Sequence, residues 1–173
     1  MLTQNNAQGP TTLPQLQIVI GSLIAGPVMF LGVTIYLITA GQFGTSAPGS
    51  QLNTILPLAW LGLFLITSPL ALVFFPRMIA VQARKKAVAL EDIEQAKREI
   101  FASYSSATVI RAAFIEGPTL FAVVILLLTG EWYMLAAIVA GLALLAGIFP
   151  TQSRYDRFFD RVTTEPEPPR ESF

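Results

Sequence analysis

The chain contains no cysteine and no histidine, and only 13% of its 173 residues are charged. Without cysteine, the chain by itself can form no disulfide and offers no thiolate nucleophile. Without histidine it has no Ser-His-Asp triad and no histidine-ligated haem, and the two absences together exclude a Cys/His zinc site. We therefore expect no cofactor and no enzymatic activity, and we expect no nucleic-acid partner.

The shortage of charge points to a lipid environment. An ordinary soluble domain has about 25% charged and about 45–50% apolar residues, whereas this chain has 13% and 53%. Its apolar residues also gather in a few long runs, which is typical of membrane-spanning helices. We predict an all-α integral membrane protein whose membrane domain covers residues 17–150 as two tandem antiparallel hairpins. The four predicted transmembrane helices are residues 18–40, 55–79, 111–129 and 132–149.

Polar segments flank the predicted membrane domain. Residues 1–16 carry no charge and lack the basic and apolar regions of a secretory signal, so we expect a disordered leader. Residues 163–173 are rich in proline and glutamate and should also be disordered. Residues 151–162 show the pattern of an amphipathic helix suited to lying in the membrane interface. Its arginines share one helical face, where they would lie near lipid phosphates: Arg154, Arg157 and Arg161.

The connection between the second and third spans, residues 80–110, is charged and contains no glycine, proline or asparagine. We expect a cytoplasmic helical extension here, with one helix running from about Asp92 to Thr129 and a chain reversal near residues 88–91. Beneath the charges runs an apolar seam, which should pack on the helix at 77–86 or on a symmetry mate rather than on a separate partner. The seam consists of Ile93, Ala96, Ile100, Ser103, Ala107, Ile110 and Phe114.

The basic residues predict an orientation. All eleven lysines and arginines lie either between the second and third spans or after the fourth. The leader, the linker at 41–51 and the turn Gly130-Glu131 have none. Because basic loops are retained on the cytoplasmic side, both termini should be cytoplasmic. The compact chain and the absence of targeting signals favour a bacterial inner (plasma) membrane.

Two distant segments of the chain resemble each other, which favours an internal duplication of a hairpin over the chance similarity of apolar helices. Both copies would enter the membrane from the same side, as in a parallel repeat. The matched residues are Ile24, Gly26, Pro27, Phe30 and Val33 in the first copy and Ile115, Gly117, Pro118, Phe121 and Val124 in the second.

Prolines interrupt the first two predicted spans. Pro27 cannot donate to the carbonyl four residues earlier, so we expect a kink there. Pro57 should lie in the first helical turn, where a missing N–H is harmless. Pro69 follows Thr67 and Ser68, whose hydroxyls can help to satisfy freed backbone groups, so a tolerated kink is favoured over a transport hinge.

Glu116 is the only acidic residue inside any long apolar run, and Ala25 stands at its place in the first copy of the repeat. It lies five residues after Arg111, hence roughly 7 Å below the inner interface at helical rise. A carboxylate at that depth must be solvated, paired or protonated.

Two interpretations of Glu116 stay open. It pairs with Arg77, Arg111 or Arg154 and holds helix ends together, or it handles a proton or cation beside the carbonyl that the adjacent Gly-Pro pair frees. The candidate residues of this region are Glu116, Gly117, Pro118 and Arg111, with Gly26 and Pro27 as their repeat counterparts.

The last predicted span carries packing signals rather than chemistry. Trp132 and Tyr133 open it and should lie at the headgroup level. Small residues at helical spacing, such as Ala137 and Gly141, favour close helix contact. These signals favour a non-catalytic structural, accessory or assembly component in the lipid bilayer, either a homo-oligomer or bound to another membrane protein. The alternative is a small oligomeric ion or proton channel or transporter that uses Glu116.

Overall fold

The computed structural model describes residues 12–43, 51–88 and 93–164. Most of the predicted leader, residues 44–50 of the linker after the first span, residues 89–91 of the reversal predicted near 88–91, and most of the tail lie outside these ranges. Within them the chain forms helices and no strand. The elements are α1 (Leu13–Thr39), α2 (Leu52–Pro69), the π-helical turn η1 (Leu70–Phe74), α3 (Phe75–Val88), α4 (Ile93–Thr129), α5 (Met134–Gly147) and α6 (Gln152–Thr164).

Three stretches of helix are long and apolar enough to cross a membrane: Leu13–Thr39, Leu52–Ala83 and Glu94–Thr129. A fourth crossing is counted if α5 and α6, which meet at a bend of 65°, are taken as one broken span. The 14 residues of α5 reach only about 21 Å at helical rise, less than the hydrocarbon thickness of about 30 Å. The described part of the chain is therefore all-α, with three or four helices able to span a bilayer, as expected of a multi-pass membrane protein.

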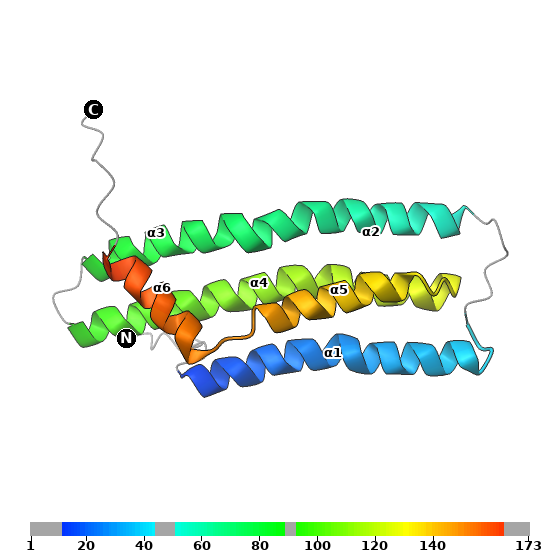
Figure 1. Ribbon diagram of the computed structural model, residues 1–173, viewed down its shortest axis with the longest axis horizontal. Helices are drawn as coiled ribbons and strands as arrows, with labels where there is room; N and C mark the ends of the chain where they lie inside the picture. The colour runs from blue at the N-terminus through cyan, green and yellow to red at the C-terminus, as the bar shows by residue number, and fades with distance from the viewer. Residues whose placement is uncertain (1–11, 44–50, 89–92, 165–173) are drawn as a thin grey trace, which may run out of the picture.

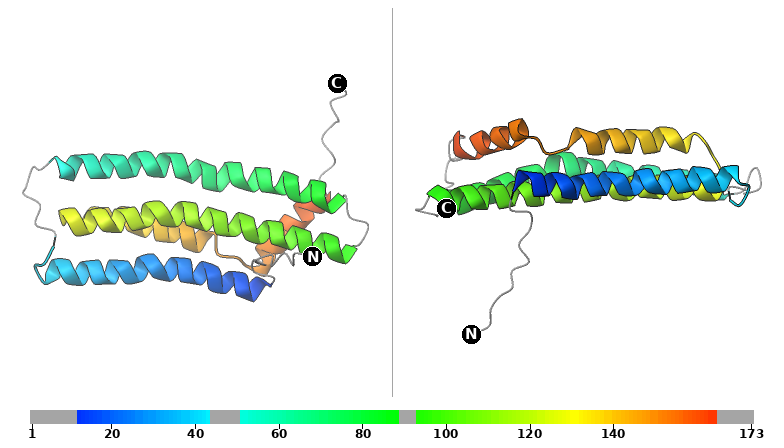
Figure 2. Two further views of the ribbon diagram at one scale, coloured as in Figure 1. Left: turned by 180° about the vertical axis from the view of Figure 1, so that it is seen from behind. Right: turned by 90° about the horizontal axis from the view of Figure 1, so that it is seen from below.

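The helices form two layers, and α4 lies in the middle of the larger one. In Figures 1 and 2, α1, α4 and the continuous rod of α2, η1 and α3 lie side by side in one flat layer, while α5 and α6 cover one face of it. α4 is in contact with all the other helical elements. α1 and α4 run parallel, and α2 and α5 run antiparallel to α4 (Figure 1).

The two predicted hairpins differ in packing. α4 and α5 pack closely because the tight turn between them, in which Gly130 adopts a φ of 70°, keeps them adjacent. α1 and α2 instead lie on opposite sides of α4, so they are not a packed pair (Figure 1). The long uncharged linker between them permits this separation.

α1 begins earlier than predicted. Its first residue is Leu13, with a proline in the first turn, so the end of the predicted leader is helical. Leu16 is fully buried and belongs to the apolar core between α1, α4 and α5. The side chain of Gln17 donates to the carbonyl of Pro150 at 3.0 Å and so ties the start of α1 to the α5–α6 linker. These contacts extend the helix beyond its purely apolar run.

The prolines of the second span also depart from expectation. α2 begins at Leu52, which places Pro57 in the second turn rather than the first. Pro57 has no backbone N–H, so the carbonyl of Asn53 receives no helical hydrogen bond from it. The hydroxyl of Tyr133 donates to this carbonyl instead, at 3.5 Å. The Asn53 amide donates to Glu131 at 3.1 Å, so polar contacts join α2 to the α4–α5 turn. η1 follows Pro69 directly, so the helix accommodates this proline by a π-helical turn.

At one end of the molecule, α3 and the first part of α4 lie side by side and α6 crosses them (Figure 1). The predicted seam packs on α3 here: Ile100, 2% exposed, forms a core with Ala83 and Val162. Further along, the rings of Phe75 and Phe114 lie 4.9 Å apart. The helix predicted at 151–162 forms as α6, and part of its apolar face packs on α4, since Tyr155 and Phe158 lie against Tyr104. Tyr155 and Phe158 stay partly exposed, and the interfacial position of the helix stays a prediction.

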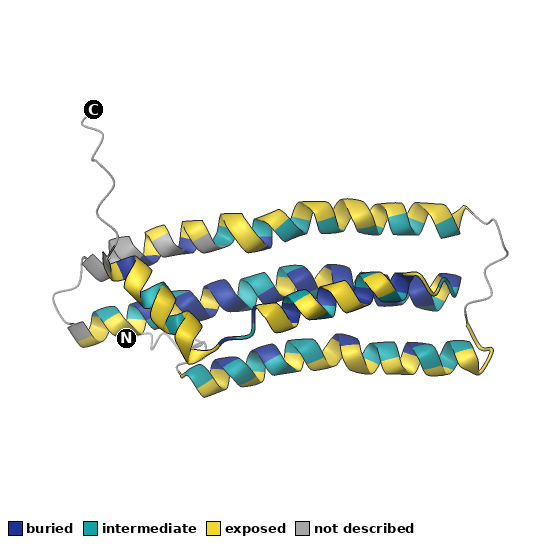
Figure 3. Ribbon diagram, in the orientation of Figure 1, coloured by how far each residue is buried: buried dark blue, intermediate teal, exposed yellow. Residues whose placement is uncertain are grey.

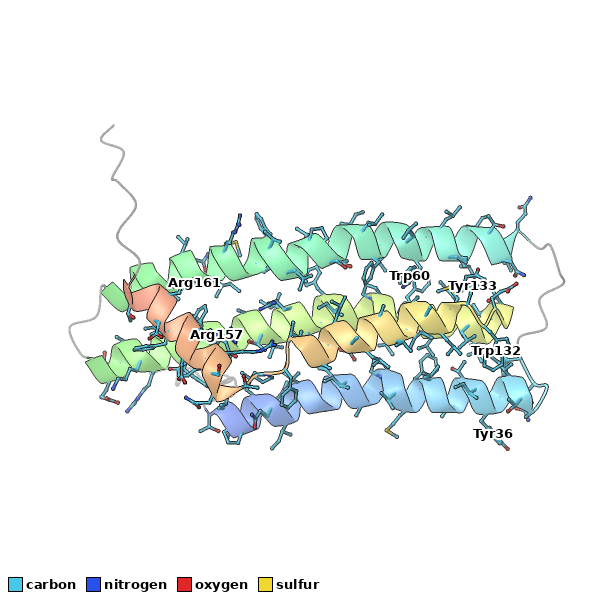
Figure 4. The ribbon with its side chains drawn as sticks, viewed as in Figure 1. Tyr36, Trp60, Trp132, Tyr133, Arg157 and Arg161 are labelled. Atoms are coloured by element: carbon cyan, nitrogen blue, oxygen red, sulfur yellow. The ribbon has the colours of Figure 1, made fainter. Side chains whose placement is uncertain are left out.

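The two ends of the bundle differ in composition. Figure 4 shows Arg157 and Arg161 at the end where α6 lies, which we call the basic end. Tyr36, Trp132 and Tyr133 lie at the opposite, aromatic end, and all three side chains are exposed. The headgroup position of Trp132 and Tyr133 stays a prediction.

Burial is concentrated in α4, and the outer helices carry many exposed residues (Figure 3), among them large apolar side chains. In the most apolar 18-residue stretch of the candidate span Glu94–Thr129, 50% is buried. In the corresponding stretch of Leu52–Ala83, 6% is buried. Ile18, Met29 and Leu65 are 72%, 73% and 62% exposed. Apolar side chains exposed along spanning helices are suited to contact with lipid tails.

Candidate functional sites on helix α4

The side chain of Glu116 lies against α1 at Gly26. A methyl group added to Gly26 would lie 3.6 Å from Oε1 of Glu116, an ordinary van der Waals distance. The two Gly-Pro segments therefore meet side by side, because parallel α1 and α4 place them at the same level. Gly26 and Gly117 are exposed and Glu116 is partly exposed, so the carboxylate lies at the open edge of the α1–α4 contact.

Glu116 forms none of the ion pairs considered from the sequence. Among the described residues it makes no ion pair with Arg77, Arg111 or Arg154 and accepts no side-chain hydrogen bond. The reason is helical geometry, since five residues correspond to about 140° around the helix axis. Arg111 faces α6 and the end of α5, whereas Glu116 faces α1.

Pro118, two residues after Glu116, is buried and is joined to α2. The indole N–H of Trp60 donates to the carbonyl of Pro118 at 2.9 Å, and Figure 4 shows Trp60 on α2 between the two ends of the bundle. Sequence reasoning did not single out Trp60. The available signal was a tryptophan inside an apolar span, because its N–H needs an acceptor where water is absent.

A second group of polar side chains surrounds a pocket of about 320 Å³ at the basic end. α4 contributes Arg111, and α6 contributes Arg154, Arg157 and Arg161, the last two of which are labelled in Figure 4. Tyr104 and Thr108 also line the pocket, and Ile148 and Phe158 complete the wall, so none of its lining residues is acidic. We call this the arginine pocket.

Two of these arginines are partly satisfied by backbone. Arg154 donates to the carbonyl of Gly147, the last residue of α5, where a cation is favourable at the helix C-terminus. Arg157 donates through Nε to the carbonyl of Ser153 at 3.1 Å. The Nε of Arg111 is buried and has no hydrogen-bond partner. The sequence grouped Arg111 with Glu116, but the structure brings it to the arginines of α6.

No group of three or more acidic residues that could hold a metal ion occurs in the described ranges. No protein-family model, curated protein or solved structure matches this chain. Within the described residues, the structure defines an all-helical protein with three or four helices that could cross a membrane. Its central helix α4 carries Glu116, which has no ion-pair partner among the described residues, and contributes Arg111 to the arginine pocket.

Proposed function

We propose that this protein is a non-catalytic structural or assembly component of a membrane complex, and that Glu116 is the contact through which it joins another subunit. The observation that carries this proposal is the carboxylate of Glu116 at the edge of the α1–α4 contact, without a partner among the described residues. The partner is either a second copy of the chain or another membrane protein.

The physical argument concerns the cost of leaving a carboxylate unpaired near the membrane. Such a group is stable there only if it is solvated, protonated or paired with a cation. Gly26 and Gly117 are both exposed beside Glu116, and their missing side chains leave room for another helix to approach closely. A lysine or arginine at the end of a partner helix would supply the missing charge.

The proposed topology has four crossings, with residues 132–149, which contain α5, as the fourth and both termini in the cytoplasm of a bacterial inner membrane. Support comes from the separation of the basic end from the aromatic end (Figure 4). We also propose that the two Gly-Pro segments derive from one duplicated hairpin. Parallel α1 and α4, with Gly26 beside Glu116, are the arrangement that a parallel repeat would produce.

The first test is the mass of the detergent-solubilised protein. If Glu116 pairs with a partner's cation, Glu116→Gln should shift a wild-type oligomer toward monomer by about tenfold or more in dissociation constant. Light scattering over a concentration series measures this. The control is Glu94→Gln, which removes an exposed carboxylate paired with Lys97 at 3.1 Å and should leave the mass unchanged.

If wild type is a monomer on its own, cross-linking in native membranes with a photoreactive residue at Gly117 should capture one defined partner. The same residue at Val139, which is exposed on α5, should not capture it. An oligomer of equal stability in both proteins, or no cross-linked partner, would refute the assembly role of Glu116.

The alternative is a small oligomeric channel or transporter in which Glu116 takes up a proton or cation. Its partial exposure favours this reading. Three of the buried hydroxyls, those of Thr108, Thr119 and Thr129, donate to carbonyls of their own helix and are not available to line a pathway. The buried hydroxyls of Thr34 and Ser105 have no hydrogen-bond partner among the described residues. Proton or sodium flux in liposomes would decide: a flux present in wild type and lost in Glu116→Ala would replace the assembly proposal.

A further inference from the structure

The arginine pocket carries positive charge that the protein does not neutralise. Four guanidinium groups line about 320 Å³, and its lining residues include no aspartate or glutamate. None of the four arginines makes an ion pair within the described part of the chain. Like charges held together disfavour the folded arrangement unless an anion joins them.

One hydrogen-bond donor of the pocket also lacks a partner. The Nε of Arg111 is buried and has no acceptor among the described residues, and an unsatisfied buried donor on a charged group is costly. Arg111 belongs to the central helix α4 and is half-buried, so it cannot swing freely into water as a surface arginine can. The site is thus built from a fixed floor on α4 and a flanking helix, α6.

We propose that the arginine pocket binds one phosphate group. Phosphate fits because its oxygens accept several charge-assisted hydrogen bonds at once, and the planar guanidinium fork matches its geometry. Arg111 holds the group from α4, and Arg157 and Arg161 close over it from α6. This inference does not depend on the role assigned to Glu116.

Two sources could supply the phosphate: the headgroup of an anionic phospholipid or a free phosphate ion. The pocket adjoins Ile148, where the chain leaves α5, so in the proposed four-crossing topology it lies near the membrane surface. Ile148 and Phe158 give it an apolar wall, which can contact the carbon backbone of a lipid but has no counterpart in a free ion.

The test is a titration of the full-length protein in a neutral detergent. Micelles containing phosphatidylglycerol, micelles containing phosphatidylcholine, and inorganic phosphate are added separately, and binding is followed by the rise in Tm. Phosphatidylcholine is the matched lipid because its phosphate is masked by a choline cation. We expect phosphatidylglycerol to raise the Tm, with an apparent affinity at least about tenfold above that for phosphatidylcholine.

The variant that tests the site is the double change Arg157→Gln and Arg161→Gln, which leaves the buried floor and the Arg154 cap in place. It should weaken phosphatidylglycerol binding by about tenfold or more, while its Tm without lipid stays close to that of wild type. The control is Arg98→Gln, which makes the same chemical change at a single position. Arg98 is exposed on α4 and does not line the pocket, so this variant should bind phosphatidylglycerol like wild type.

Comparing the titrations with lipid and with inorganic phosphate shows whether the pocket binds a lipid headgroup or a free phosphate ion. If inorganic phosphate protects wild type as well as the lipid does, and the double variant loses that protection, the site takes a free ion. If only the anionic lipid protects, and the double variant loses this, the site takes a headgroup. Equal binding by wild type and the double variant, or no difference between the two lipids and no effect of phosphate, would overturn the proposal.

Discussion

Gly141→Ala should destabilise the protein, although alanine is a better helix former than glycine. A β-carbon at Gly141 would overlap the hydroxyl oxygen of Thr119 and lie 3.0 Å from its Cβ and Cγ2. Thr119 is β-branched and 2% exposed, and its hydroxyl is bound to the carbonyl of Ile115 at 2.7 Å, so it cannot move aside easily. We expect a loss of about 1–3 kcal/mol, the usual range for overpacking.

The matched control is Gly62→Ala in α2, where an added β-carbon meets nothing within 4 Å. This change should be neutral or stabilising by up to about 1 kcal/mol, because alanine has the higher helix propensity. Unfolding in a denaturant series in detergent measures both variants. Thr119→Ala in the Gly141→Ala background should restore part of the loss, since it removes two of the three clashing atoms. Equal effects of the two glycine changes would show that α4 and α5 are not in close contact at Gly141.

Ile100→Asp should release α6 from the rest of the molecule. Ile100 forms the core that joins α4, α3 and α6, together with Ala83 and Val162. An aspartate there would lose these apolar contacts and leave an unpaired carboxylate buried, at a combined cost of about 3–5 kcal/mol. The ratio of docked to released α6 should fall by at least about 100-fold.

Limited trypsin digestion with mass spectrometry measures this release, because α6 contains the cleavage sites Arg154, Arg157 and Arg161. Cleavage at these sites should be much faster in Ile100→Asp than in wild type. Ala102→Asp adds the same charge two residues further along α4, at an exposed position, and should be cleaved at the wild-type rate. The released helix should also lose phosphate binding at the arginine pocket. Wild-type cleavage rates in Ile100→Asp would mean that α6 is not held by this core.

Interactions local to one helix could be read from the sequence. The helix predicted from about Asp92 to Thr129 is observed as Ile93–Thr129, and the amphipathic segment after Pro150 is observed as α6. Both predictions rest on periodicity and on backbone hydrogen bonds within a single segment, which need no partner. The start of α1 and the place of Pro57 were missed because contacts with distant residues, Pro150 and Tyr133, stabilise those helix ends.

The candidate site shows where local reasoning ends. Arg111 and Glu116 are close in the chain, and the sequence alone left their pairing open. The rotation of α4 about its own axis decides that one faces α6 and the other faces α1. Likewise Gly141 and Gly147 each follow an alanine by four residues, Ala137 and Ala143. An added β-carbon nevertheless meets Thr119 at Gly141 and nothing within 4 Å at Gly147.

By itself the sequence determined that this chain is helical and suited to a membrane, because a shortage of charge and long apolar runs act through solvation, residue by residue. Only the tertiary structure decided which faces of those helices meet. Spanning helices are apolar on nearly all sides, so hydrophobic periodicity does not specify their rotation or their neighbours. Close packing at Gly141 against Thr119, and hydrogen bonds such as that of Trp60 to Pro118, make that choice.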